Sequence, residues 1–316
     1  MQERSGLISI AVPCFNEQKG IRHFVETLTP VLETLGHPYE ILFVDDGSTD
    51  DTLAILTVLA NADPRLKVIG LTRNFGKEAA LTAALDFVSG DAVIPMDADL
   101  QDPVELVPCM VARWEAGAEI VLAHRQARPG DSAARRWAAR RFYRIISRLS
   151  AIPIPADVGD FRLIDRKVVE CVRQLPEKTR FMKGILAWPG FHSETLEFTR
   201  PPRQTGGSKW PLWKLFNFAL DGIFSFSTAP LRVWTYLGVA LSLFSLGYLL
   251  WVMGKTLLLG VDVPGYASTL SVILFFNGII LIGLGILGEY LGRVFVEVKG
   301  RPVYLVKSTV GFDTKT

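Results

Sequence analysis

Two long stretches without a charged residue lie near the end of the 316-residue chain. Residues 233–254 form a stretch of 22, and residues 263–288 a stretch of 26. As a helix, the shorter stretch would be about 33 Å long, which matches the ~30 Å hydrocarbon core of a bilayer. The alternative is a pair of buried core helices, but these rarely run past about 20 residues without a charge. The sequence therefore predicts two transmembrane helices.

Basic residues around these stretches predict their orientation, because Lys and Arg collect on the cytoplasmic side of a membrane. The connector, residues 255–262, holds only Lys255. We therefore expect an inner (cytoplasmic) membrane protein with two spans, a short external connector, and both termini and the large N-terminal domain in the cytoplasm. Two helices are too few for a transport pathway, so we expect them to act as an anchor. The basic residues that flank their outer ends are Lys214, Arg232, Arg293, Lys299, Arg301 and Lys307.

Charge is divided unevenly within the first 232 residues, which have the charge content of a soluble domain. Residues 1–110 carry a net charge of −10 and residues 111–232 a net charge of +10. An acidic half suits a metal-bound ligand. A basic half suits a phosphate group or an anionic membrane surface.

Short apolar runs alternate with helical patterns through the N-terminal part of the chain. This alternation, with runs rich in Val, Ile and Leu, is typical of an α/β fold with a mostly parallel sheet covered on both faces. We expect ligands to bind beyond the carboxyl ends of the strands, where the polar residues cluster. Strands are predicted at 7–12, 39–44, 66–71, 91–96 and 118–123, and helices at 17–35, 51–61, 77–89 and 103–116.

Asp97, Asp99 and Gln101 follow the fourth predicted strand. Carboxylates at positions i and i+2 can reach one cation together, and the Gln101 amide adds a neutral oxygen. Such hard ligands select Mg²⁺ or Mn²⁺, and Mg²⁺ completes its shell with water and substrate phosphates. The alternative is a helix start capped by Asp102 with Pro103 in the first turn. Both can be true, and we expect a metal site.

Asp45 and Asp46 end the second predicted strand, before a turn at Gly47. Two adjacent carboxylates are more than a helix cap requires, so one could accept a hydrogen bond from a ribose or from a base N–H. Residues 1–232 contain neither Gly-x-Gly-x-x-Gly nor Gly-x-x-x-x-Gly-Lys-Ser/Thr. Dinucleotide-dependent redox enzymes and P-loop hydrolases are therefore excluded.

Two segments suggest contact with lipid. Residues 135–149 form a basic amphipathic pattern, whose arginine face favours anionic lipid head groups or a lipid phosphate. An ordinary surface helix packed on the core is the alternative, and nucleic acid is excluded as a partner by the predicted spans. Residues 210–226 are apolar nearly all round and predict either an interfacial helix along the bilayer or a buried core helix. The arginines of the first face are Arg136, Arg140, Arg141, Arg144 and Arg148.

Four motifs occur here in the order found in inverting family 2 glycosyltransferases with the GT-A fold: residues 12–17, 44–50, 73–77 and 97–103. Residues 159–163, residues 206–209 and the two predicted spans extend the resemblance over nearly the whole chain. The sequence looks like a polyprenyl-phosphate glycosyltransferase. It resembles the bactoprenol glucosyltransferases of O-antigen modification most, and dolichol-phosphate mannose synthase more distantly.

The resemblance implies roles for individual residues. The metal ligands would be Asp97, Asp99 and Gln101, with Mg²⁺ or Mn²⁺ as cofactor. Asp160 would be a general base or a residue that orients an arginine, and Lys209 lies in a loop that closes over the donor. The donor-binding residues would be Pro13, Phe15, Glu17, Asp45, Asp46, Lys77, Asp97, Ala98 and Asp99. The catalytic residues would be Asp160, Arg125, Arg162, Arg203 and Lys209.

The reaction implied by the resemblance moves a sugar from a nucleotide onto undecaprenyl or another polyprenyl phosphate, for modification of a cell-envelope glycan such as the O-antigen of lipopolysaccharide. UDP-glucose is the first choice of donor. UDP-N-acetylglucosamine, UDP-galactose, GDP-mannose and a modified pentose remain open. A processive polysaccharide synthase would need a Gln-x-x-Arg-Trp motif and more spans. A non-catalytic membrane scaffold would not need intact metal and phosphate motifs.

We expect four regions along the chain. They are a cytoplasmic GT-A glycosyltransferase domain (1–207), an interfacial amphipathic helix region (208–231), two transmembrane helices (232–290) and a cytoplasmic C-terminal tail (291–316). Small residues in the second span would allow close packing between subunits of a homo-oligomer. These are Gly278, Gly283, Gly285 and Gly288.

Overall fold

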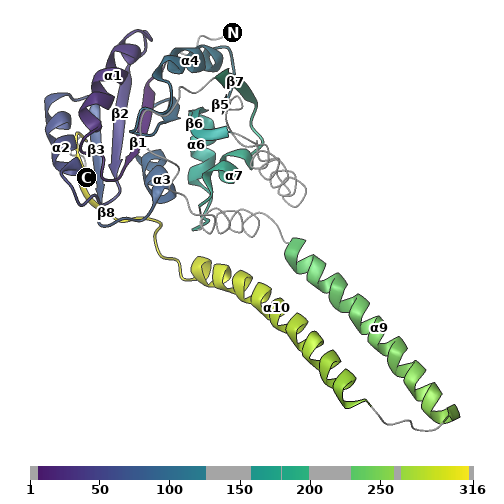
Figure 1. Cartoon of the computed structure of the whole chain (residues 1–316). Coiled ribbons are helices and arrows are strands. Elements are labelled where there is room, and N and C mark those ends of the chain that lie inside the picture. Colours follow the sequence, from purple (N-terminus) through teal and green to yellow (C-terminus); the bar gives the residue numbers. More distant parts are fainter. Residues whose placement is uncertain (1–5, 126–157, 179, 199–228, 260–264, 313–316) are drawn as a thin grey trace.

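An eight-stranded sheet forms the centre of the computed structural model, which describes residues 6–125, 158–178, 180–198, 229–259 and 265–312 (Figure 1). The strand order is β7-β5-β6-β4-β1-β2-β3-β8. Strands β4, β1, β2 and β3 run parallel, and β6 lies antiparallel between β4 and β5. The strands are β1 Ile8–Cys14, β2 Tyr39–Asp45, β3 Leu66–Leu71, β4 Ala92–Pro95, β5 Ile120–Arg125, β6 Val158–Asp165, β7 Ser193–Phe198 and β8 Val306–Val310.

Helices cover both faces of the sheet. One face packs against α1, α2 and α4, and the other against α3, α6 and α7. The central strands are therefore buried on both sides, which is why they read as continuous apolar runs; every residue of β2 is buried. The prediction of an α/β fold with a mostly parallel, doubly covered sheet is confirmed. The helices are α1 Ile21–Glu33, α2 Thr52–Ala62, α3 Lys77–Phe87, α4 Val107–Glu115, α6 Arg166–Arg173 and α7 Met182–Ala187.

All five strands and four helices predicted from the sequence are present, with ends shifted by a few residues. A 3₁₀ turn, Val104–Leu106, precedes α4, and its N-cap position is Pro103, one residue after the expected Asp102. Strands β6, β7 and β8 were not predicted. Two of them, β6 and β8, run antiparallel to their neighbours.

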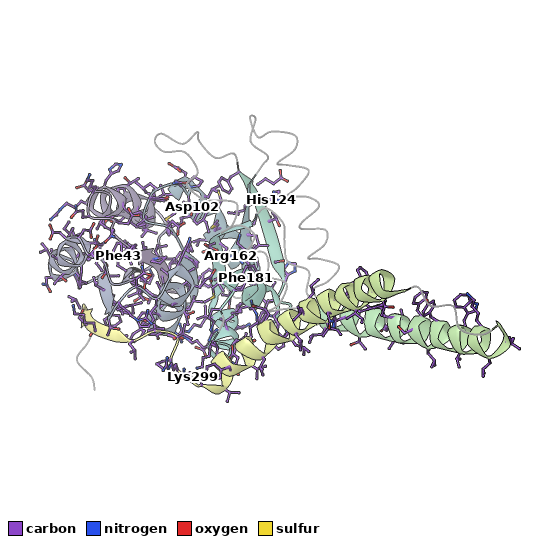
Figure 2. All side chains as sticks on the ribbon, turned by 60° about the horizontal axis from the view of Figure 1, so that its bottom comes forward. Phe43, Asp102, His124, Arg162, Phe181 and Lys299 are labelled. Atoms are coloured by element: carbon purple, nitrogen blue, oxygen red, sulfur yellow. The ribbon has the colours of Figure 1, made fainter. Side chains whose placement is uncertain are left out.

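A hairpin of two long helices, α9 (Ala229–Leu259) and α10 (Tyr266–Val298), projects from the sheet domain (Figure 1). Figure 2 shows that most of the hairpin extends away from the described part of the sheet domain. Large apolar side chains such as Leu243, Phe244 and Leu281 are exposed on it. Gly283 of α10 lies against the indole of Trp234 in α9, where a Cβ would clash. That glycine therefore lets the two helices approach within one chain.

One helical segment in the described part of the chain is long and apolar enough to cross a membrane. This is Phe275–Val298, with 24 residues and a mean hydropathy of 1.9, whereas Val233–Tyr248 is a shorter apolar segment. Both helices extend beyond the uncharged stretches of the sequence. Lys255 lies inside α9 and not in the connector, because one long basic side chain does not end a helix. Helix α10 also continues past residue 288 to Val298. An ion pair between Glu289 and Arg293 (2.9 Å), one turn apart, lies in this last part of the helix.

After α10 the chain returns to the sheet. Strand β8 pairs with β3, and the Tyr304 hydroxyl donates a hydrogen bond to Asp86 at the end of α3 (2.7 Å). The backbone N–H of Lys178 donates to Glu297 near the end of α10 (2.9 Å). The segment after the hairpin, expected to be a tail, therefore adds an edge strand to the sheet.

Some predicted features lie outside the described residues. These are the basic helix 135–149, the interfacial helix 210–226, Arg203 and Lys209. Arg125 ends β5, but its side chain also lies outside the described part.

A buried carboxylate near the start of β2 ties three elements together. Glu40 is 3% exposed, accepts hydrogen bonds from the Ser9 hydroxyl and the Ser89 N–H, and pairs with Lys67 (Nζ–Oε2 2.7 Å). Burial raises the pKa of Glu40, but the hydrogen bonds from Lys67, Ser9 and Ser89 outweigh it and hold that pKa below its usual value. Glu40 is therefore ionised and fully partnered in the folded protein.

We expect Glu40→Ala to lower the free energy of unfolding by about 3 kcal/mol, because it leaves Lys67 and two buried donors without their acceptor. Since the folded pKa of Glu40 is depressed, its stabilisation is present above the unfolded value of 4.5 and is lost as the pH falls through the folded value. Thermal unfolding of the full chain in detergent, at neutral pH and below about pH 4, measures both effects. Glu26→Ala, at an exposed position of α1, is the control. Equal melting of the two variants at neutral pH would contradict the prediction.

Candidate active site

Asp46 fastens the end of β2 to the loop that follows β3. Its two carboxylate oxygens accept hydrogen bonds from the N–H groups of Phe75 (2.7 Å) and Gly76 (2.9 Å). The residue is 3% exposed, and this burial raises its pKa against the effect of the two bonds. Asp46 thus fixes the loop that leads directly into α3.

Asp45, the residue before Asp46, has one carboxylate oxygen that accepts no hydrogen bond from the described residues. It is buried, and its Oδ2 accepts the N–H of Ser48 (3.2 Å), whereas its Oδ1 has no hydrogen-bond partner among the described residues. Buried acceptors in native proteins nearly always have a partner. An N–H or O–H group of a ligand would satisfy this oxygen, which fits the predicted contact with a ribose or a base.

Hydrogen bonds join the loop after β1 to the loop after β2. Asn16 adopts the left-handed region (φ 56°), which Asn tolerates better than most residues. Its N–H donates to the Ser48 hydroxyl (2.9 Å), and its side-chain oxygen accepts the N–H of Thr49 (2.9 Å). The ring of Phe15 is left 44% exposed at this otherwise polar edge.

Negative charge is concentrated where β4 ends. Asp97 and Asp99 flank the buried Ala98, and the N–H of Gln101 donates to Asp99 (3.1 Å). Burial and then the charges of Asp99 and Asp97 raise the pKa of Glu17 across the edge. Within the described ranges no group of three or more His, Cys, Asp or Glu could hold a metal. Two carboxylates and an amide nevertheless fit a hard divalent ion that takes its other ligands from water and phosphate.

Lys77, at the first position of α3, bridges two carboxylates from different strands. Its Nζ lies 2.6 Å from Asp97 and 2.7 Å from Asp160 at the start of β6. Burial lowers the pKa of Lys77, but the charges of Asp97 and Asp160 prevail and raise it above its usual value. Asp160 is correspondingly held below its usual pKa by Lys77, against the effect of burial. Lys77 and Asp160 are therefore both charged.

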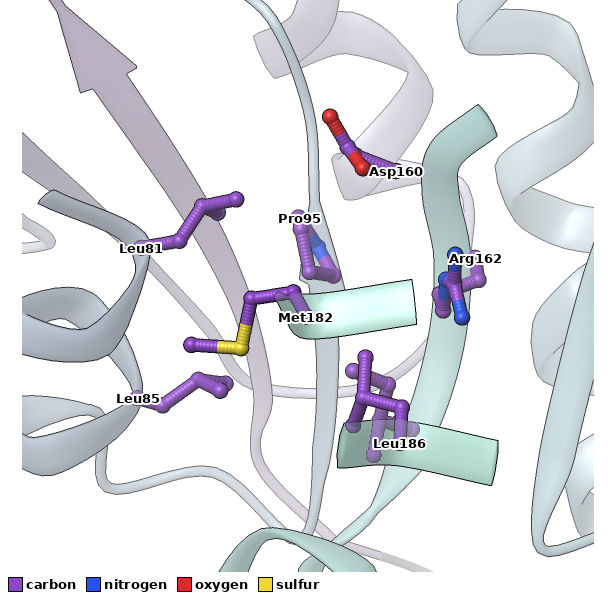
Figure 3. A pocket seen from close by; sticks show the side chains of 8 residues that line it. Leu81, Leu85, Pro95, Asp160, Arg162, Met182 and Leu186 are labelled. Atoms are coloured by element: carbon purple, nitrogen blue, oxygen red, sulfur yellow. The ribbon is translucent and has the colours of Figure 1, made fainter. Parts of the chain in front are cut away.

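Arg162 and Asp160 border a mainly apolar pocket, shown in Figure 3. Arg162 is 4% exposed, and its Nη2 donates to the carbonyl of Gly159 (2.6 Å), while its Nε has no hydrogen-bond partner among the described residues. The apolar walls exclude water from this side of the guanidinium. They are formed by Leu81, Leu85, Pro95, Ile164, Met182 and Leu186.

Sequence reasoning missed two charged residues at this place, Glu78 and Lys183. Glu78 accepts the N–H of Met182 (3.1 Å), and burial raises its pKa to about 7. Lys183 is half-buried on α7, and burial lowers its pKa. Glu78 could have been identified as a site residue from the sequence, because it directly follows the predicted site residue Lys77. No motif surrounds Lys183, so only the fold reveals it.

The structure gathers most of the predicted site residues at one edge of the sheet. For Arg125, at the end of β5, only the backbone belongs to the described part of the chain. Their individual roles stay predictions. The residues brought together are Pro13, Phe15, Glu17, Asp45, Asp46, Lys77, Asp97, Ala98, Asp99, Gln101, Asp160 and Arg162.

A mostly parallel α/β sheet, with an Asp-x-Asp after β4 and an antiparallel β6, is the arrangement of the GT-A fold class. Residues 9–173 match Glycosyl transferase family 2, and residues 229–294 match the GtrB C-terminal hairpin. The chain belongs to glycosyltransferase family 2 and is an enzyme of that class.

Relatives share nearly the full length of the chain. An uncharacterized glycosyltransferase of Synechocystis is 51% identical, over 97% of this chain and 96% of its own. The SfII prophage-derived bactoprenol glucosyl transferase of Shigella flexneri is 48% identical, over 96% and 98%. Among solved structures, glucosyl-3-phosphoglycerate synthase of Mycobacterium tuberculosis is 21% identical with a TM-score of 0.49, over 70% of this chain and 80% of that chain.

Gly47 allows the loop after β2 to pack closely against the loop after β3, and its substitution tests that geometry. It has φ +67°, and a Cβ there would collide with the backbone of Arg73 and Asn74. We expect Gly47→Ala to weaken UDP binding by at least about 10-fold and to lower the melting temperature, because the loops must separate. Gly36 has a similar φ of +70° with nothing within 4 Å, so Gly36→Ala should cost only about 1–2 kcal/mol of stability. Calorimetric UDP titration and thermal unfolding compare the two variants, and equal effects would contradict this account.

Proposed function

We propose that the protein transfers a sugar, glucose from UDP-glucose in the first instance, onto polyprenyl phosphate at the inner face of the cytoplasmic membrane. The observation that carries this proposal is the bridge from Asp97 through Lys77 to Asp160, since it joins the predicted donor side of the site to the predicted acceptor side. The bactoprenol glucosyl transferase of Shigella flexneri supports this acceptor, because its similarity covers both the catalytic domain and the helical hairpin.

The reaction would be a displacement at the anomeric carbon. An oxygen of the acceptor phosphate forms a bond to that carbon while the bond to the diphosphate oxygen breaks. The nucleoside diphosphate leaves with the electron pair, and the configuration inverts. Asp97, Asp99 and Gln101 would hold Mg²⁺ or Mn²⁺, which neutralises charge on the departing diphosphate when bound.

Asp160 is proposed to position cations and not to accept a proton. A phosphate monoester has a second pKa near ~6 and is already deprotonated at neutral pH, so it needs little help from a base. The ion pair with Lys77 lowers the pKa of Asp160, and this makes it a weak base. Basic side chains such as Arg162, and the predicted Arg125, Arg203 and Lys209, suit the binding of phosphates.

Helices α9 and α10 are proposed to span the membrane twice, with the catalytic domain and both termini in the cytoplasm. The exposed apolar side chains of the hairpin support a lipid environment. Such an anchor would keep the site at the plane where the acceptor phosphate lies. The product would serve modification of a cell-envelope glycan, and the small residues of α10 would permit a homo-oligomer. Other sugar nucleotides remain alternative donors.

Replacing Asp99 tests the metal site. We expect Asp99→Asn to lower kcat by at least about 100-fold and to weaken activation by Mn²⁺, because one anionic ligand is lost. EDTA should abolish wild-type activity, and added Mn²⁺ or Mg²⁺ should restore it. Mass spectrometry of lipid-linked sugar formed from a panel of sugar nucleotides measures turnover and identifies the donor. Glu105→Gln, at an exposed position nearby, should stay within twofold of wild type. Full activity of the wild type in EDTA would overturn the metal assignment.

The pH dependence of Asp160→Asn separates positioning from proton transfer. As a positioning residue, its loss should lower kcat by about 10- to 100-fold and leave the acid limb of the pH–rate profile near ~6, where the acceptor phosphate titrates. As a general base, its loss should abolish turnover at every pH in this range. Steady-state rates between pH 5 and pH 8 distinguish the two outcomes.

A further inference from the structure

Lys183 lies beside the acceptor side of the site without belonging to any motif. Its neighbour Met182 donates its N–H to Glu78 (3.1 Å) and lines the same pocket as Asp160 and Arg162 (Figure 3). The start of α7 is thereby fastened to α3, immediately after Lys77. The ammonium of Lys183 is close enough to interact electrostatically with the charges of Asp160, Arg162 and Glu78.

The cations of this cluster are not all held by ion pairs of the kind that Lys77 makes. Lys77 is committed to both Asp97 and Asp160. Arg162 is buried, and its Nε has no hydrogen-bond partner among the described residues. A buried cationic donor without an acceptor indicates a partner that joins later. An anion with several oxygens would fit beside Arg162 and Lys183.

The type of anion follows from the position. The donor diphosphate is expected at Asp97 and Asp99, on the far side of Lys77. Arg162 and Asp160 line the apolar pocket between α3 and α7, and Lys183 directly follows Met182, which belongs to the same lining. A phosphate monoester that carries a hydrocarbon chain has both features, a compact anion and an apolar neighbour.

We propose that Lys183, together with Arg162, binds the phosphate of the acceptor, and that Glu78 positions Lys183 through the backbone of Met182. This inference rests on the proposed function and adds two residues to it. The competing explanation is that Lys183 only neutralises Glu78 and stabilises the fold.

Steady-state kinetics of the full chain in detergent test the proposal. We expect Lys183→Ala to raise the KM for undecaprenyl phosphate by about 10- to 100-fold, the effect of losing a hydrogen bond to a charged group, and to leave the KM for the sugar nucleotide within twofold. Lys183→Arg should restore most of the acceptor affinity. Lys167→Ala, at an exposed position of α6, should behave as wild type. Glu78→Gln should give a smaller rise in the acceptor KM alone.

Three patterns of KM values would overturn the inference. These are an unchanged acceptor KM in Lys183→Ala, an equal rise of both KM values, and a rise confined to the donor, which would assign Lys183 to the diphosphate. Calorimetric UDP titration shows whether each variant is folded, and Lys183→Arg supplies the comparison if Lys183→Ala is not. Inorganic phosphate and phosphatidylglycerol vesicles are competitors in parallel reactions. Stronger inhibition of wild type than of Lys183→Ala by the vesicles alone would assign Lys183 to lipid head groups and also overturn the inference.

Failure of the proposed function itself is distinguishable. If the wild type makes no lipid-linked sugar from any donor, binding of farnesyl phosphate to the full chain still tests Lys183, with farnesol as the uncharged control. Weaker binding of farnesyl phosphate by Lys183→Ala, with farnesol unchanged, supports the phosphate site. Equal binding by wild type and variant overturns it.

Discussion

The ammonium of Lys77 connects three parts of the protein that are distant in sequence. It is carried by α3, and it contacts Asp97 after β4 and Asp160 at the start of β6. Without it, these carboxylates would repel each other across an edge that already contains Asp99 and Glu17. The position of α3 therefore sets the spacing between Asp97 and Asp160, which we propose to lie on the donor and acceptor sides of the site. A displacement of this one helix would change both sides at once.

The other end of α3 is held as firmly as its start. Arg173 donates to the carbonyls of Leu85 and Asp86 (2.8 Å each), which satisfies acceptors that a helix end leaves free. Tyr304, from the segment after the helical hairpin, bonds the Asp86 side chain (2.7 Å). The hairpin is thus connected to the site through a single rigid helix as well as through strand β8.

The sequence predicted the parts of the fold that local patterns encode. Buried parallel strands such as β2 read as apolar runs, and polar residues such as Asp45 and Asp97 follow them directly, so the edge of the sheet could be located. Strand β8 could not be predicted, because Val306–Val310 is short and half-polar and becomes a strand only against the free edge of β3. Lys183 could not be identified from the sequence for a similar reason. Its proximity to Asp160 arises from the packing of α7 on α3, and neither segment carries a pattern that reveals it.

An anionic acceptor must approach an edge whose own residues are mostly acidic. The uneven charge along the chain offers a physical solution, because the acidic residues of the edge come from residues 1–110 and the cations Arg162 and Lys183 come from the basic half. Arg162 and Lys183 lie on β6 and α7, so a phosphate that arrives from their side meets positive charge before it meets Asp97. Since charges at close range in a partly buried site are screened less than in water, this order matters for binding. The antiparallel strand β6 is therefore more than an addition to the sheet, because it brings the basic half of the chain to the acidic edge.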